Sequence, residues 1–394
     1  MKPTNEDDVS DDDSVRDASS RALTTYAMLI RTRGEDANAS EGARKARAYA
    51  TSENDVASAR CAEALIASRS NASTRAWREV EEVLEIADDD ASVSDAMRMA
   101  SVAGARTLAA LTRHRVGDAL ASAETCRRAI EGASAQALEE AKAEPHGWAI
   151  AMALKTLGHV ERLRRADADA DARALEFYAR ALEYAKDVSL NDSPRAMASR
   201  VIAGELIVDC RLALAQLLTA GGDATLAETH AASAVSGAEA LGDEKHPCVG
   251  VAIAVSGDVY VAKALRSMTG ASVLGDGAGV MFAEGLYRNA IKLMHYPHVV
   301  EDASIVLDYE ARHLCALLHA RYSSVLRASG EQRRRESDSW LASAKLLWPD
   351  ERERPEGGVN GVDVVTSAAT KLGTKNGIQV LIDLQQMTPL TLGR

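Results

Sequence analysis

Proline is nearly absent from a long, alanine-rich stretch of this sequence, and the four prolines that interrupt it are almost evenly spaced. Between residues 4 and 348 the only prolines are Pro145, Pro194, Pro247 and Pro297, which are 49, 53 and 50 residues apart. Proline is tolerated in the first turn of a helix but breaks a helix interior. The spacing therefore indicates that each proline opens the same kind of unit, about the length of two antiparallel helices with their turns.

Composition supports helices throughout. About one residue in five is alanine, the best helix former, whereas aromatic residues make up only 4% of the 394 residues and phenylalanine occurs twice. Strand-favouring residues are too few for an all-β sandwich or a parallel α/β sheet. The length allows either two or three domains or one elongated array of repeats.

Small residues recur at matching intervals and favour the single array. In three sets the last two positions are seven residues apart: Gly158, Ala174 and Ala181; Ala215, Ala227 and Ala234; Gly257, Ala283 and Ala290. The first position lies 12 residues earlier in the second set, and 16 and 26 residues earlier in the other two, where the turn between the helices is longer. Close pairing of two helices requires small side chains where they meet. We therefore predict an all-α fold, an α-solenoid of antiparallel helical hairpins, with units at about 14–50, 52–90, 94–137, 147–188, 195–243, 247–297 and 301–348. Ser14 with Asp17, and Ser52 with Asp55, are predicted to cap the first two units.

The middle units resemble a known repeat. Leu154-Lys155-Thr156-Leu157-Gly158-His159-Val160, followed by Ala174 to Leu182, is similar to a tetratricopeptide repeat. His246-Pro247 followed by Gly257-Asp258-Val259-Tyr260, and then Ala283 to Ile291, resembles the longer repeat of the kinesin light chain type. The resemblance covers residues 147–294. It implies a right-handed superhelix whose first helices line a concave groove that binds peptides or protein surfaces.

Two departures limit what the resemblance implies about partners. Kinesin light chains carry a long coiled coil ahead of their repeats, and this chain offers an acidic leader instead. Their groove has paired asparagines where this sequence has Ala254 and Val255. We therefore do not expect cargo binding in the manner of that family, but we do expect a general role in binding proteins or peptides.

The two ends of the chain differ from the array at 14–348. Residues 1–13 contain six acidic residues against Lys2 and are predicted to be a disordered acidic leader. Residues 349–394 form a C-terminal tail that we predict to be partly disordered. Its apolar segment at 378–384 is either a short helix or strand packed on the array, or loose.

Charge and apolar patterning exclude several partners. The net charge is −12, and about −7 without the leader, so the body lacks the basic surface that nucleic acid requires. No stretch approaches eighteen continuous apolar residues, which predicts no membrane span. Five widely spaced cysteines without a Cys-x-x-Cys motif predict buried free thiols and a reducing compartment. We expect the cytoplasm, or an organelle interior if the N-terminus is incomplete.

No motif for chemistry occurs. The sequence has no nucleophile elbow, dinucleotide fingerprint or phosphate loop, and the glycine-rich segment at 270–279 is predicted to be a loop between helices. His313 and His319 are six residues apart and therefore lie on different faces of a helix. We predict no metal, no cofactor and no enzymatic activity.

The remaining prediction concerns binding. If the first helices line a groove, its polar residues in the clearest units are Lys155, His159, Arg162, Asp209, Gln216 and Asp258. The predicted function is a non-enzymatic scaffold or adaptor that binds a peptide or protein partner there. Two alternatives are an organelle assembly or maintenance factor built on the same repeats, and the helical sensor region of a regulator or enzyme.

Overall fold

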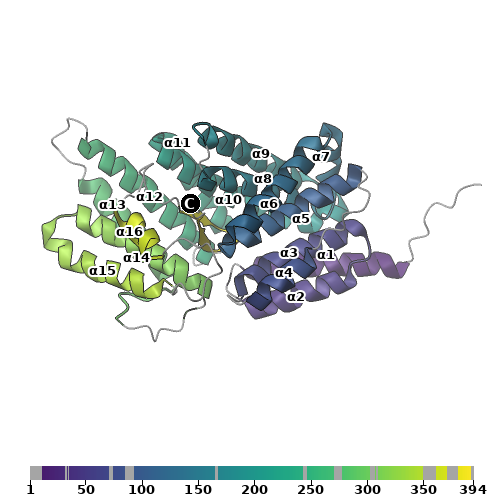
Figure 1. Cartoon of the computed structure of the whole chain (residues 1–394), viewed down its shortest axis with the longest axis horizontal. Coiled ribbons are helices and arrows are strands. Elements are labelled where there is room, and N and C mark those ends of the chain that lie inside the picture. The colour runs from purple at the N-terminus through teal and green to yellow at the C-terminus, as the bar shows by residue number, and fades with distance from the viewer. Residues whose placement is uncertain are drawn as a thin grey trace, which may run out of the picture.

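The computed structural model describes most of the chain. The residues described are 11–31, 33, 35–70, 74–84, 93–164, 167–242, 246–269, 277–301, 307, 309–348, 361–370 and 380–391. Within these ranges the chain forms sixteen α-helices and one two-stranded sheet. The prediction of an all-α solenoid of antiparallel helical hairpins is confirmed (Figure 1).

Seven helical hairpins follow one another along the chain, and the first helix of each packs on the first helix of the next. The hairpins are α1/α2 (Asp11–Arg31 and Asp36–Tyr49), α3/α4 (Glu53–Ser70 and Thr74–Val83), α5/α6 (Val93–Thr112 and Val116–Gly132), α8/α9 (Gly147–Arg164 and Ala170–Leu190), α10/α11 (Met197–Gly221 and Ala224–Leu241), α12/α13 (Pro247–Thr269 and Gly277–Leu293) and α14/α15 (Tyr309–Ala328 and Arg334–Leu347). The short helix α7 (Ala135–Ala141) connects the third hairpin to the fourth.

The prolines mark these units with different precision. Pro247 is the first residue of α12, and Pro194 begins the 3-10 turn Pro194–Ala196 that leads into α10. Pro145 lies two residues before α8, where its carbonyl accepts hydrogen bonds from Ser58 of the second hairpin and Ser199 of the fifth. Pro297 lies in the connection that follows α13 rather than at the start of a helix. Proline therefore marks the entrance to a first helix in three of the four units.

The predicted caps at the start of the array are only partly correct. Helix α1 begins at Asp11, so Ser14 lies inside the helix and the prediction of a cap there is wrong. Asp17 instead accepts hydrogen bonds from the backbone N–H groups of Thr51 and Ser52, at 2.6 and 3.1 Å, where α3 begins. Ser52 accepts the N–H of Asp55, as predicted for an N-cap. Residues 1–10 of the predicted leader lie outside the described residues.

The array curls until units that are distant in sequence meet. Arg31 at the end of α1 forms a buried ion pair with Glu205 of α10, with Nη2 and Oε2 3.2 Å apart. Helix α14 contacts α3, and the rings of His114 and His313 lie 5.7 Å apart between centroids. Figure 1 shows the result: the first and last hairpins lie along one side of the molecule and the middle hairpins along the other.

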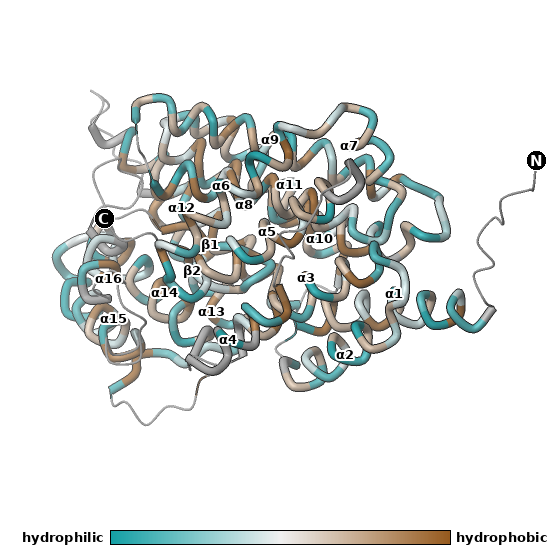
Figure 2. Tube along the Cα trace, turned by 45° about the vertical axis from the view of Figure 1, so that its right-hand side comes forward, coloured by the Kyte–Doolittle hydropathy of each residue, from teal (hydrophilic) through white to brown (hydrophobic). Residues whose placement is uncertain are grey.

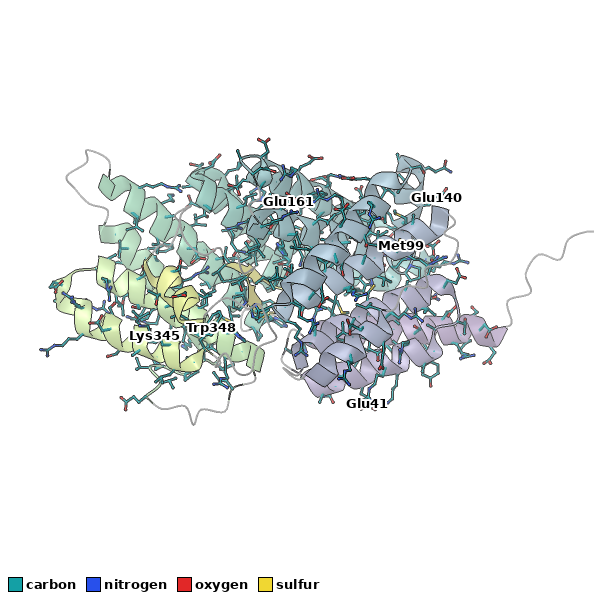
Figure 3. The ribbon with its side chains drawn as sticks, viewed as in Figure 1. Glu41, Met99, Glu140, Glu161, Lys345 and Trp348 are labelled. Atoms are coloured by element: carbon teal, nitrogen blue, oxygen red, sulfur yellow. The ribbon has the colours of Figure 1, made fainter. Side chains whose placement is uncertain are left out.

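Two large apolar cores fill this array. One extends from α1 to α10 and the other from α10 to α15, and alanine side chains pack throughout both. Figure 2 shows the hydrophobic residues gathered toward the interior. Charged side chains such as Glu41, Glu140 and Lys345 extend from the outer surface (Figure 3). All five cysteines are buried.

One helix is long and apolar enough to span a membrane by length and composition. It is Pro247–Arg266, the main part of α12, and 78% of this segment is buried inside the array. Its neighbours are α10, α11 and α13. The apolar side chains of α12 thus serve the second core.

The C-terminal region returns to the middle of the molecule. Of the predicted tail at 349–394, residues Gly361–Thr370 form α16, which packs on α14 and α15. Strands β1 (Leu381–Asp383) and β2 (Thr388–Leu390) form an antiparallel hairpin in which Ile382 pairs with Pro389. We call residues 380–391 the terminal hairpin. The glycine-rich segment at 270–279 lies outside the described residues up to 276, and Gly277 begins α13.

Candidate functional site

The first helices of the middle hairpins direct polar side chains to one inner face. Lys155 and His159 of α8 are four residues apart, and Asp209 and Gln216 of α10 are seven apart, so each pair shares one side of its helix. These four were predicted to line the groove, and all lie within the array with no more than 5% of any side chain exposed. We call Lys155, His159, Asp209 and Gln216 the inner polar set.

The inner polar set contacts the terminal hairpin, which is the central feature of the structure. Gln216 pairs with the backbone of Ile382 in both directions: its Nε2 donates to the carbonyl and its Oε1 accepts the N–H, each at 2.9 Å. Asp209 accepts the N–H of Leu384 at 3.0 Å. A two-stranded hairpin is only marginally stable on its own. Here helical side chains form the hydrogen bonds to its backbone that neighbouring strands would form in a larger sheet.

A buried charge cluster lies at the centre of this contact. The Nζ of Lys155 is bonded to Oδ2 of Asp209 and lies 2.5 Å from Oδ2 of Asp383. The Oε1 of Gln385 accepts a further hydrogen bond from Lys155 at 3.2 Å. His159 is 3.0 Å from the same Asp383 oxygen through Nε2. None of these side chains is exposed to solvent. Asp383 therefore joins two residues of α8 to the terminal hairpin.

Burial and neighbouring charges set the protonation states. Burial opposes the charge on Lys155, but Asp209 and Asp383 outweigh it and raise the pKa of the ammonium group. Burial likewise opposes ionisation of Asp383, yet Lys155 and His159 outweigh it and hold its pKa well below the usual range. Burial lowers the pKa of His159. A neutral His159 then donates from Nε2 to Asp383 and accepts at Nδ1 from the hydroxyl of Tyr178, 2.8 Å away.

The same arrangement of glycine, tyrosine and polar residue occurs twice in the array. A Cβ on Gly158 would lie 2.5 Å from the ring of Tyr178, and one on Gly257 would lie 3.1 Å from the ring of Tyr287. Each tyrosine hydroxyl bonds to the residue after that glycine, His159 in one unit and Asp258 in the other. Glycine is required there because the tyrosine ring packs directly on the helix backbone.

The other two predicted residues bond to neighbouring helices of the array. Arg162 donates to the backbone carbonyl of Gln216 at 3.0 Å and so supports α10 from α8. Asp258 forms a buried ion pair with Arg321 of α14, with 2.5 Å between Nη1 and Oδ2, in addition to its bond with Tyr287. Both side chains are less than 6% exposed. They join neighbouring units to one another.

Sequence reasoning did not find the remaining contacts of the terminal hairpin. Ser68 of α3 donates to Oε1 of Gln386 at 3.4 Å, and His114 after α5 pairs with Thr391 at 3.1 Å. Strand β2 also contacts α14. The only signal available in the sequence was the apolar segment at 378–384, and periodicity cannot assign so short a segment to a strand inside a helical array.

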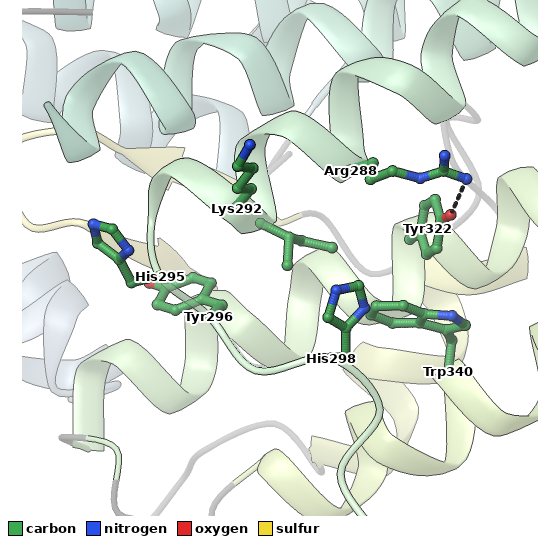
Figure 4. A pocket seen from close by; sticks show the side chains of 8 residues that line it. Arg288, Lys292, His295, Tyr296, His298, Tyr322 and Trp340 are labelled. Carbon is green, nitrogen blue, oxygen red and sulfur yellow. Dashed lines mark hydrogen bonds between the residues drawn. The ribbon is translucent and has the colours of Figure 1, made fainter. Parts of the chain in front are cut away.

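A separate pocket opens at the sixth and seventh hairpins. Its cavity volume is about 450 Å³. Arg288 of α13 lies beside the ring of Tyr322 and His298 beside that of Trp340, and Lys292, His295, Tyr296 and Ile291 complete the lining (Figure 4). Arg288 lies 3.3 Å from the hydroxyl of Tyr322 and pairs with Glu284 at 2.6 Å. No residue of the inner polar set lines this pocket.

Metal-binding geometry is not found among the described residues, where no three His, Cys, Asp or Glu side chains converge. His319, one of the histidines considered from the sequence, bonds to the carbonyl of Pro297 at 3.0 Å and to Ser343 at 2.9 Å. Its ring packs against that of Trp340. It joins the connection after α13 to α14 and α15.

Comparison with known proteins gives a structural neighbour only. No family model matches the sequence, and no curated protein matches it. Among solved structures, the chain is similar to a Rap protein crystallised with Competence and Sporulation Factor, with a TM-score of 0.46 and 12% sequence identity over 85% of this chain and 79% of the Rap chain. The fold defines the chain as an α-solenoid of helical hairpins. Its functional assignment depends on the contacts described above.

Proposed function

We propose that this chain is a non-enzymatic scaffold that binds an extended segment of a protein partner on the inner face of its helical array. One observation carries the proposal: the inner polar set already holds an extended polypeptide, the terminal hairpin. Gln216 and Asp209 bond to its backbone and Lys155 and His159 to its Asp383. Main-chain hydrogen bonds with side-chain pockets are a common mode of peptide recognition.

The geometry of the inner face suits binding rather than catalysis. Lys155 is held between two carboxylates, and His159 is fixed between Tyr178 and Asp383. Each potential acid or base is thus engaged in holding polypeptide. Rigid helices present these groups in a fixed arrangement, which limits the entropy lost on association.

The repeat type forms part of the proposal. The packing of Tyr178 on Gly158 and of Tyr287 on Gly257 supports a tetratricopeptide-like unit in the fourth and sixth hairpins. Ala254 and Val255 are both buried in α12. These positions offer no polar group to a partner, so we propose repeats of the kinesin light chain type without that family's mode of cargo binding.

Affinity capture with the full chain as bait, followed by hydrogen exchange of the bait with the purified captured protein, tests this function. We expect the partner to change backbone exchange in α8, α10 and the terminal hairpin. Glu140→Lys on the exposed surface of α7 is the control variant, and we expect it to bind the partner as the wild type does.

Three results would contradict the proposal. One is a partner that changes exchange only on the second helices, such as α9 and α11. Another is a partner whose binding is abolished by Lys292→Glu in the separate pocket and which leaves backbone hydrogen exchange in α8 and α10 unchanged. The third is turnover by the purified chain of any compound it is found to bind, which would contradict its non-enzymatic character.

A further inference from the structure

The terminal hairpin lies in an unusual environment for a permanent part of a core. Its apolar side chains Leu381, Ile382, Leu384 and Leu390 are completely buried in the two apolar cores, whereas its backbone and Asp383 meet charged and amide groups of α8 and α10. Interfaces that never open are predominantly apolar, and a buried ion pair contributes little stability beyond that of apolar residues of the same size. A polar inner face is suited to a surface that is at times exposed to water.

The terminal hairpin also fits this face imperfectly. Gln385 and Gln386 are both fully buried. The Oε1 of Gln385 accepts a hydrogen bond from Lys155, and the Oε1 of Gln386 accepts one from Ser68. Neither Nε2 has an acceptor within the described parts of the chain. A buried donor without an acceptor lowers the stability of the contact, because the donor loses its hydrogen bonds to water. An apolar side chain of suitable shape in its place carries no such cost. Ser68 also donates to the carbonyl of Leu65 at 2.8 Å, so a segment without the Gln386 amide leaves no helical donor unpaired and has a physical advantage over the chain's own. Gln385 differs, because Lys155 uses its Oε1 as an acceptor.

From these two observations, and given the proposed scaffold function, we propose that the terminal hairpin is a displaceable intramolecular occupant of the inner face. The segment that replaces it is an extended peptide from a partner. It carries an aspartate flanked by apolar residues, as Asp383 is by Ile382 and Leu384, an acceptor at the position of Gln385 and an apolar side chain at the position of Gln386.

Each part of this peptide chemistry corresponds to a contact. The aspartate forms an ion pair with Lys155, which a neutral or basic side chain cannot do, and accepts a hydrogen bond from His159. Gln216 and Asp209 bond to backbone groups and accept any sequence in extended conformation. Selectivity therefore arises from the aspartate and its apolar neighbours. Because the occupant belongs to the same chain, it competes at high effective concentration, and a partner must bind more tightly to displace it.

The test uses the full chain and a fluorescent synthetic peptide with the sequence of residues 380–391. Fluorescence polarisation measures peptide binding to the wild type and to full-length Asp383→Ala, which weakens the intramolecular occupant. We expect Asp383→Ala to bind the peptide at least about tenfold more tightly than the wild type. Asp363→Ala, on the exposed part of α16 in the same C-terminal region, is the matched control and should behave as the wild type.

Altered peptides test the chemistry. Asp383→Asn in the peptide should weaken its binding to the Asp383→Ala chain about tenfold or more, because one charge of the buried pair is lost. The change Gln386→Leu in the peptide should strengthen binding about tenfold, because an unpaired donor is removed while Ser68 keeps the Leu65 carbonyl as its acceptor.

A second measurement does not depend on the folding of a variant. Excess Gln386→Leu peptide added to the wild-type chain should accelerate hydrogen exchange in residues 380–391, because the terminal hairpin leaves the inner face. Unchanged exchange at saturating peptide would overturn the proposal. So would a folded Asp383→Ala chain that binds the peptide no better than the wild type.

Two further outcomes separate this inference from the scaffold function. If the chain elutes as a dimer that the peptide converts to monomer, the segment is exchanged between copies and the intramolecular proposal is wrong. If a captured partner changes exchange in α8 and α10 while no peptide binds, the scaffold function stands and the displacement of the terminal hairpin is refuted.

Discussion

Replacing Lys155 with methionine tests whether the charge cluster holds the terminal hairpin in place. Methionine keeps most of the apolar length of lysine, and the ammonium group is lost. Asp209 and Asp383 both lie against that group and would then face each other without a cation, because both carboxylates are fully buried. His159 still contacts Asp383 but is neutral when the histidine pKa is lowered by burial.

The expected loss follows from these contacts. Removing one partner of a buried ion pair typically costs about 3–5 kcal/mol, because it leaves an uncompensated charge in a region of low polarity. With an unfolding entropy of about 2.1 cal/mol/K per residue, an array of this length should melt about 4–6 °C lower. Adding Asp209→Asn to Lys155→Met should restore part of this loss, since one of the two facing charges is removed.

Thermal unfolding followed by circular dichroism at pH 7 measures the effect, with Lys345→Met on the exposed surface of α15 as the matched control. The pH dependence gives a second check. In the wild type the lowered pKa of Asp383 contributes stability above its unfolded pKa of about 3.9, and this contribution is lost as the pH falls below that value. The difference between wild type and variant should therefore shrink as the pH falls below about 4. A variant that melts within 1 °C of the wild type at pH 7 would refute the reasoning.

Three further predictions concern single sites elsewhere. Burial raises the pKa of Glu205 to about 7, so the folded state binds the proton more tightly than the unfolded state. Stability should therefore fall as the pH rises from about 4.3 through 7. In urea unfolding at pH 5 and pH 8, Glu205→Gln should show a smaller fall in stability between the two pH values than the wild type. Burial lowers the pKa of His146 to about 4, and neither ring nitrogen has a partner among the described residues. His146→Leu should therefore stabilise by about 1 kcal/mol, with a larger gain at pH 5 than at pH 8; equal gains would contradict this. Gly158→Ala should lower stability by about 1–3 kcal/mol because its Cβ meets the ring of Tyr178, whereas Gly285→Ala, with open space around it, should raise stability by about 0.5–1 kcal/mol.

The helical hairpins could be predicted because local rules determine them. A proline cannot lie inside a helix, so Pro194 and Pro247 had to fall near helix starts. Glycine at 158 and 257 marked positions where the two helices of a unit approach closely. Ser14 was placed incorrectly because the acidic residues before it extend α1 to Asp11, and a sequence rule for caps does not indicate how far a helix continues.

Only the helical side of the candidate site could be predicted from the sequence. The polar positions of α8 and α10 follow from helical periodicity, so Lys155, His159, Asp209 and Gln216 could be found from the sequence. What fills the space between them could not, because Asp383 lies 228 residues from Lys155 and no local pattern connects them. A three-residue strand has too little periodicity to reveal its partners, and β1 bonds to the side chain of Gln216 as well as pairing with β2.

The position of the terminal hairpin has a consequence for how the protein is assembled. A stack of repeats can form progressively, since each unit rests on the one before it. Residues 380–391, however, are synthesised after all the helices they contact, and they bond to Ser68 and His114, which lie 318 and 277 positions from their partners. Contacts between such distant residues form slowly. During translation the charges of Lys155 and Asp209 therefore stay hydrated until the end of the chain arrives, and the centre of the molecule is the last part to be completed.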